Sequence, residues 1–227
     1  MLFRSQVSAS SAMVEKGEYR HFMEKEIHEQ PDSVQHTLSE YLDLVTGKAK
    51  TIPVDFDAID RIQIVACGTA FYAGQIGRYA FERLAGLPCD VEIASEFRYR
   101  APVMEPGGLM IVISQSGETA DTLAALRHAK AEGQTIAAVV NVPTSSMARE
   151  AALLLPTHAG PEIGVASTKA FTSQLVALHL LALYMAQVRG TLAQGDIRHH
   201  IESLLHLPQT IEQAIKASGV MSRVMRN

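Results

Sequence analysis

The sequence predicts an α/β fold: a three-layer αβα sandwich on a five-stranded parallel sheet, flanked by helices towards both ends of the chain. Two observations carry this prediction. Short β-rich runs alternate with helical patterns between about Ile52 and Gly190, and such alternation favours right-handed crossovers and a parallel sheet. The strand runs are almost entirely apolar, as is typical of strands covered on both faces. We therefore expect one doubly wound domain in this region.

The first forty-odd residues have apolar side chains near helical spacing, interrupted by Pro31. The proline should end one helix near Glu29, and Asp32 or Ser33 should cap the next. The segment GKAKTIPVD that follows is rich in turn-forming and polar residues, and we expect a loop there.

Five strand-like runs come next, each followed by a helical pattern or a polar loop. The runs are RIQIVACG (61–68), CDVEIA (89–94), GLMIVISQ (108–115), TIAAVVN (135–141) and LLLPT (153–157). Helices are expected at about 69–86, 119–132 and 145–151, and a long helix from near Ser167 to about Arg189. The tail from Asp196 to about Ala217 is again helical, with a break at Pro208.

These patterns divide the chain into four parts. We expect a linker or cloning remnant at residues 1–16, N-terminal helices at 17–50, the α/β domain at 51–190, and a helical connector at 191–227.

Composition narrows the class of protein. The 227 residues are 47% hydrophobic with a net charge of −4, and no long basic run occurs, so nucleic acid is not expected as a partner. Two cysteines, Cys67 and Cys89, are typical of reduced thiols, and the N-terminal sequence lacks a stretch suited to a signal peptide. We therefore expect a cytoplasmic protein.

One apolar segment, Phe171–Val188, raises the question of a membrane span. It contains Gln174, His179 and Gln187 and lacks clearly ordered charged flanks. These features favour a helix buried in a core or a subunit interface over a membrane helix.

The segment ISQSGETADT places small polar residues where the third strand gives way to a helix. A helix N-terminus supplies unpaired N–H groups, and side-chain donors are available from Ser114, Gln115, Ser116 and Thr119. Gly117 would let the backbone come close to a ligand. This pattern predicts a phosphate site, although serine and threonine at this position could also serve only as helix caps.

Other chemistries receive less support. GxGxxG after the first strand and the phosphate-binding lysine motif GxxxxGK[ST] are both absent from the sequence, so we expect no nucleotide cofactor. The histidines lie in helical patterns without metal-ligand spacing, and we expect no metal site. Lys169 could be a Schiff-base amine if it were buried, but a lysine in a first helical turn is more often exposed.

Several motifs together resemble one family. CGTA, CDVEIASEFRYR, SQSGETADTL, NVP.SS and EIGVASTKAFTSQL are similar to the first sugar-isomerase (SIS) subdomain of the glucosamine-6-phosphate synthase family, and YRHFMEKEIHEQP is similar to the start of its isomerase domain. The resemblance extends from about Lys16 to the end of the chain. It implies a flavodoxin-like αβα sandwich that binds fructose 6-phosphate, which the family converts to glucosamine 6-phosphate with ammonia from glutamine.

The resemblance also implies roles for particular residues. Ser114, Gln115, Ser116 and Thr119 would hold the phosphate. Thr69, the backbone of Val165 and the hydroxyl of Ser167 would contact the sugar. The family usually has a serine after CGT; here the residue is Ala70, which puts that contact in doubt.

The catalytic groups of the family are expected elsewhere. The resemblance places a nucleophilic cysteine in a separate glutaminase domain, and a glutamate, a lysine and a neighbouring subunit's histidine in a second SIS subdomain. We therefore expect no catalytic residue in this chain, and we do not favour Glu162, the carboxylate nearest the proposed pocket, as a base. The chain would then be a fragment that binds its substrate without turnover.

Two alternatives stay open at this point. The chain could be a single-SIS phosphosugar isomerase that completes its site by oligomerising, or a sugar-phosphate-sensing regulatory module.

A homodimer is expected in any case, because the N-terminal helices and Phe171–Val188 offer apolar faces. The competing interpretation is that these helices only cover the sheet.

Overall fold

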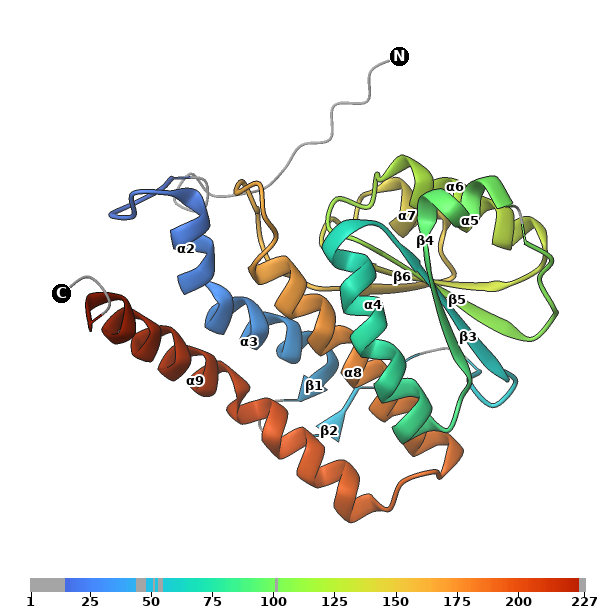
Figure 1. Ribbon diagram of the computed structural model, residues 1–227. Helices are drawn as coiled ribbons and strands as arrows, with labels where there is room; N and C mark the ends of the chain where they lie inside the picture. The colour runs from blue at the N-terminus through green and yellow to red at the C-terminus, as the bar shows by residue number, and fades with distance from the viewer. Residues whose placement is uncertain (1–14, 44–47, 51, 53–54, 101, 225–227) are drawn as a thin grey trace.

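The computed structural model describes residues 15–43, 48–50, 52, 55–100 and 102–224. Its centre is a five-stranded parallel sheet between two layers of helices (Figure 1). The predicted three-layer αβα sandwich is confirmed. Residues 1–14, most of the predicted linker, lie outside the described residues, and the predicted domain limits stay a prediction.

The sheet has the order β4-β3-β5-β6-β7. Its strands are β3 (Arg61–Ala66), β4 (Cys89–Ile93), β5 (Gly108–Ser114), β6 (Thr135–Val140) and β7 (Leu153–Pro156). The chain runs from β3 outwards to β4, then returns to the other side of β3 to form β5. The winding direction therefore reverses between β3 and β5, and ligands of open parallel sheets bind at the carboxyl ends of the strands beside such a reversal.

The central strands are apolar because both faces of the sheet are covered. All seven residues of β5 are buried. On one face Ile64 and Ile111 join a core under α4 and α8, and on the other Val65 and Val112 join a smaller core under α5, α6 and α7. This burial explains why the strand runs lack alternation of polar and apolar residues.

The helices of the α/β region begin close to the predicted positions. They are α4 (Gly68–Ala80), which continues as a π-helical turn, η1 (Phe81–Ala85), and then α6 (Ala120–Ala131), α7 (Ser146–Glu150) and α8 (Lys169–Arg189). Gly86 and Gly190 end η1 and α8 in the left-handed conformation that favours glycine. A further helix, α5 (Ala94–Arg100), was missed, because its sequence ASEFRYR directly extends the strand pattern of β4.

Within the part of the chain that the structure describes, two helices precede the sheet and one follows α8. These are α2 (Phe22–His28), α3 (Gln30–Tyr41) and α9 (Gln194–Val224), and they lie together on the α8 side of the molecule (Figure 1). A small antiparallel ribbon of β1 (Leu42–Asp43) and β2 (Lys48–Ala49) flanks part of the predicted loop. The loop prediction was therefore wrong at β2.

Two boundary predictions involving proline need correction. The break between α2 and α3 lies at Glu29 as expected, but Asp32 and Ser33 do not cap α3, because the helix begins before them and Pro31 sits in its first turn, where a missing N–H is tolerated. Pro208 lies within α9 and does not end it. Leu204, Leu205 and Leu207 before Pro208 and Ile211 after it pack against the main core, which holds the helix in place.

The long helix α8 is long and apolar enough to cross a membrane, and 61% of its most apolar window is buried inside the molecule. It packs against α3, α4 and α9. The apolar face of α8 that the sequence offered as a subunit interface is thus largely used within the chain.

Candidate functional site

A pocket of about 470 Å³ lies at the carboxyl ends of β3 and β5, beside the reversal of the sheet. Three segments that are distant in sequence line it: the start of α4, the β5–α6 loop, and the loop before α8. All seven predicted ligand-contacting residues are among its lining residues: Thr69, Ser114, Gln115, Ser116, Thr119, Val165 and Ser167.

The β5–α6 loop is organised by its own hydroxyl groups. The Oγ atom of Ser114 is 2.9 Å from Oγ1 of Thr119 and accepts a hydrogen bond from the backbone N–H of Gly117 at 3.0 Å. Gly117 has a φ of +67°, a left-handed conformation that turns the chain sharply. Ser114 itself is only 3% exposed, so its hydroxyl forms the floor of the loop.

The alternative that the loop only caps α6 is not favoured by the geometry. Thr119 is the residue that precedes α6, yet its side chain makes no capping hydrogen bond and instead contacts Ser114. The Thr119 side chain therefore accepts no hydrogen bond from the first backbone N–H groups of α6. Ser116 is exposed at the pocket and Gln115 is half-buried, so both side chains can reach a ligand.

Glu118 does not place its charge in the pocket. Its carboxylate accepts a hydrogen bond of 2.7 Å from the backbone N–H of Ser146, at the start of α7. This contact directs the negative charge away from the cluster of hydroxyl groups, which leaves the pocket able to accept an anion.

The loop before α8 is held by two carboxylates. Glu162 accepts hydrogen bonds from the backbone N–H groups of Thr168 and Ala170 at 2.8 and 3.2 Å, and from the hydroxyl of Ser167 at 3.2 Å. It therefore caps α8, where a negative charge is favourable. Because its oxygens are already used in this way, the geometry does not favour Glu162 as a general base.

The second carboxylate, Glu26, comes from α2 and was not anticipated. It is 2% exposed, and its Oε1 accepts hydrogen bonds from the backbone N–H groups of Ile163 and Gly164 at 2.5 and 2.9 Å. The next residue, Val165, is fully exposed at the pocket. Glu26 thus fixes the position of the loop that carries two of the predicted sugar contacts.

Lys169 is buried but does not face the pocket as a free amine. Its Nζ atom forms an ion pair of 2.7 Å with Glu29, at the junction of α2 and α3, and it lines a different, smaller cavity of about 170 Å³. The ion pair keeps this amine engaged, so the Schiff-base interpretation is not supported. Across the described ranges, no group of three or more histidine, cysteine, aspartate or glutamate residues is placed to hold a metal ion.

The two cysteines are free and lie in different surroundings. Burial raises the pKa of the Cys89 thiol to about 12. Cys67 is half-buried and lines the pocket just before α4.

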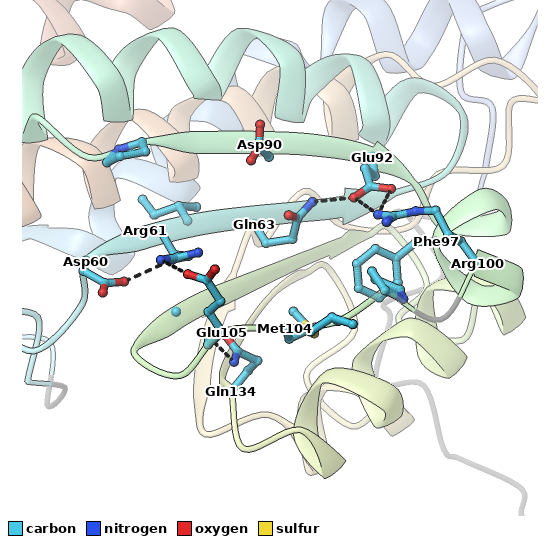
Figure 2. Close-up of a pocket in the computed structure, with 15 residues that line it drawn as sticks. Asp60, Arg61, Gln63, Asp90, Glu92, Phe97, Arg100, Met104, Glu105 and Gln134 are labelled. Atoms are coloured by element: carbon cyan, nitrogen blue, oxygen red, sulfur yellow. Dashed lines mark hydrogen bonds and ion pairs between the residues drawn. The ribbon is translucent and has the colours of Figure 1, made fainter.

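A larger cavity, of about 540 Å³, runs along β3 and β4 from Asp60, just before β3, to Glu92 and Arg100 (Figure 2). Its charged groups pair with one another: Arg100 contacts both carboxylate oxygens of Glu92, at 2.6 and 2.7 Å, and Arg61 contacts Glu105 at 2.5 Å (Figure 2). Asp60 and Asp90 add further negative charge to the lining. Four carboxylates outweigh two guanidinium groups there, so this cavity does not suit an anionic ligand.

Fold and pocket together define a doubly wound α/β domain with a pocket rich in neutral hydrogen-bonding groups at its reversal point. The family model of the SIS domain matches residues 56–184, more than half of the chain. The chain belongs to the SIS domain family.

Similar proteins agree with this assignment. The chain is 59% identical over 218 residues to the glutamine–fructose-6-phosphate aminotransferase (isomerizing) of Zymomonas mobilis, and 56% identical over 220 residues to that of Caulobacter vibrioides. The alignments cover 95% and 96% of this chain but 36% of each relative. The chain thus spans about a third of the length of these relatives.

A solved structure shows the same arrangement. The C-terminal domain of glucosamine-fructose-6-phosphate aminotransferase from Francisella tularensis superposes with a TM-score of 0.87 at 42% identity. The match covers 92% of this chain and 60% of that one.

Proposed function

We propose that this chain is the sugar-phosphate-binding half of the isomerase domain of a glutamine–fructose-6-phosphate aminotransferase. The observation that carries the proposal is the convergence of seven candidate residues, from three separate segments, on one pocket at the reversal of the sheet. The name and identity of the relatives support fructose 6-phosphate as the substrate.

In this proposal the phosphate lies over the β5–α6 loop. Ser114, Gln115, Ser116 and Thr119 surround it, together with the N–H groups at the start of α6. Each hydrogen bond to a charged oxygen contributes roughly 1.5–3 kcal/mol, so a few neutral donors can hold a dianion without lysine or arginine. Fixed dipoles of this kind need little reorganisation when the ligand arrives.

The sugar would extend from the phosphate towards α4 and the loop before α8. Thr69 lies in the first turn of α4, and Ser167 and the backbone of Val165 lie on the opposite wall. The Ser167 hydroxyl donates its proton to Glu162, so its oxygen is oriented to accept a hydrogen bond from a sugar hydroxyl.

We propose that the isolated chain binds the sugar phosphate without isomerising it. Proton transfer between two sugar carbons needs a base within hydrogen-bond reach of the carbon acid. Among the described residues that line the pocket, Glu162 is the only carboxylate, and its role in capping α8 leaves it badly placed for this task. The base would then come from another part of the longer protein.

The proposal includes a cytoplasmic homodimer. The bacterial relatives support the location. The dimer is supported by large apolar side chains exposed on the outer face of α4, namely Tyr72, Ile76 and Tyr79. Such a stripe on a monomer surface favours contact with another protein surface.

Titration calorimetry with fructose 6-phosphate and with unphosphorylated fructose tests the proposal. We expect Ser116→Ala to weaken binding of the phosphorylated sugar by roughly 1–3 kcal/mol, because one hydroxyl donor is lost, and to leave any binding of fructose unchanged. Ser203→Ala, on the exposed surface of α9, is the matched control. Equal losses for both sugars would show that the loop does not contact phosphate, and turnover by the purified chain would refute the proposed lack of a base.

A further inference from the structure

Gln174 is an unusual residue for its position. It lies in α8, among apolar neighbours, and is 3% exposed. Its side-chain oxygen Oε1 is buried and has no hydrogen-bond partner among the described residues. A buried carbonyl oxygen normally has a hydrogen-bond partner, so one that has no partner and lies at a pocket is a candidate to bind a ligand.

The buried polar groups beside it are satisfied. The hydroxyl of Ser173 is 2.7 Å from that of Ser33, and Lys169 forms its ion pair with Glu29. The other unpaired buried side-chain atom found in the described part of the chain, Nε of Arg189, is at the far end of α8. The lack of a hydrogen-bond partner at Gln174 is therefore local and is not a general feature of how α8 packs.

The position of Gln174 connects this unpaired oxygen to the pocket. Its side chain is one of those that line the proposed ligand site. Side chains on a helix lean towards its N-terminus, and Gln174 is two turns after Ser167, so it leans towards the loop before α8. Helix α8 also packs against α4, which carries Thr69. Gln174 thus belongs to the wall that α8 and the loop before it contribute to the pocket, where the sugar is proposed to lie.

We infer that Gln174 is a further ligand-contacting residue of this pocket, whose carboxamide turns to a hydroxyl group of the bound sugar. The inference rests on the proposed function and extends it to a residue outside the seven candidates. The oxygen has no hydrogen bond to break when the side chain moves, and the terminal torsion of glutamine rotates easily. A carboxamide can both accept from and donate to hydroxyl groups, which suits a polyhydroxylated ligand.

Gln174→Leu separates this role from a structural one. Leucine has a similar size and removes the unpaired oxygen, so we expect the melting temperature of the empty protein to rise by about 2–4 °C. We expect the affinity for fructose 6-phosphate to fall about tenfold or more, because the sugar loses a hydrogen-bond partner. Affinity for inorganic phosphate, which under the proposed function would occupy only the β5–α6 loop, should change less than about twofold.

Calorimetry and thermal unfolding of the full chain measure these effects, with Gln187→Leu on the exposed end of α8 as the control. Gln174→Asn is a second variant: it keeps the neutral carboxamide on a side chain one methylene shorter, so it should fold and retain more affinity for the sugar phosphate than the leucine variant. If the wild-type chain binds fructose 6-phosphate and Gln174→Leu binds it equally well, the inference about Gln174 is wrong while the proposed function stands. If both ligands weaken by the same factor, Gln174 supports the pocket as a whole and does not contact the sugar. Failure of the wild-type chain to bind fructose 6-phosphate would overturn the proposed function and this inference together.

Discussion

Gly117 shows how one residue can fix the geometry of the proposed phosphate loop. Its φ of +67° is in the left-handed region, and a Cβ atom added there would meet the side chain of Ser145. We predict that Gly117→Ala lowers the free energy of unfolding by at least about 2 kcal/mol, since backbone strain and a steric clash act together. Urea denaturation measures the loss.

Gly133 is the matched control for this substitution. It also has a left-handed φ, of +78°, but a Cβ atom there would have no neighbour within 4 Å. Gly133→Ala should therefore cost only the backbone term of about 1 kcal/mol. Equal losses for the two variants would mean that close packing against Ser145 contributes nothing to the loop.

Among the secondary-structure elements, α2 holds in place the loop before α8, which is far from it in sequence. The Glu26 carboxylate holds the backbone at Ile163 and Gly164, and hydrogen bonds to a charged group each contribute about 1.5–3 kcal/mol. We predict that Glu26→Ala weakens binding of fructose 6-phosphate severalfold, because Val165 and Ser167 lose their fixed positions. Binding of inorganic phosphate to the β5–α6 loop should be preserved, and calorimetry with the two ligands separates these effects.

Glu24→Ala, on the exposed side of α2, controls for the loss of a charge from this helix. Rescue by Glu26→Gln should be partial, since glutamine keeps one acceptor oxygen but not the charge. The explanation fails if Glu26→Ala leaves the affinity for the sugar phosphate as it was.

For the whole molecule, the most relevant surface is the outer face of α4, which exposes large apolar side chains. Tyr72, Ile76 and Tyr79 are exposed by 62%, 52% and 61%, and they form one stripe along the helix that begins next to the pocket. We predict that the chain forms a dimer through this stripe and that Tyr79→Glu shifts it towards the monomer, because a charge would be buried in the contact. Analytical ultracentrifugation measures the equilibrium.

Tyr99→Glu is the control for this experiment. Tyr99 is 79% exposed on α5, on the opposite side of the sheet, and substituting it should leave the association unchanged. A monomeric wild-type chain would remove the dimer from the proposal and leave the binding site untouched.

The strands and most helices could be predicted because their signals are local. The apolar runs of β3, β5 and β6 and the glycines after η1 and α8 mark these elements in the sequence alone. Helix α5 and the uninterrupted α9 could not be predicted in the same way. Contacts with the rest of the molecule hold α9 across Pro208, and α5 follows β4 without any turn residue to mark the boundary.

The same distinction applies to the site. The hydroxyl-rich β5–α6 loop could be found by its composition at a strand end. The roles of Glu26 and Glu162 could not, because each carboxylate acts on a backbone that the fold brings to it. Gln174 carried one signal, a polar residue within an apolar helical pattern, but the sequence could not show that its oxygen would lack a partner.

The hydrogen bonds that Glu26 accepts from Ile163 and Gly164 have a practical consequence for anyone who shortens this protein. The region that matches the SIS domain begins at residue 56, thirty positions after the carboxylate that fastens one wall of the pocket. A fragment trimmed to that region would keep every strand of the main sheet and every hydroxyl of the β5–α6 loop. It would nevertheless leave two backbone N–H groups without their acceptor, so assays on such a minimal domain would report on a looser pocket than the one this chain builds.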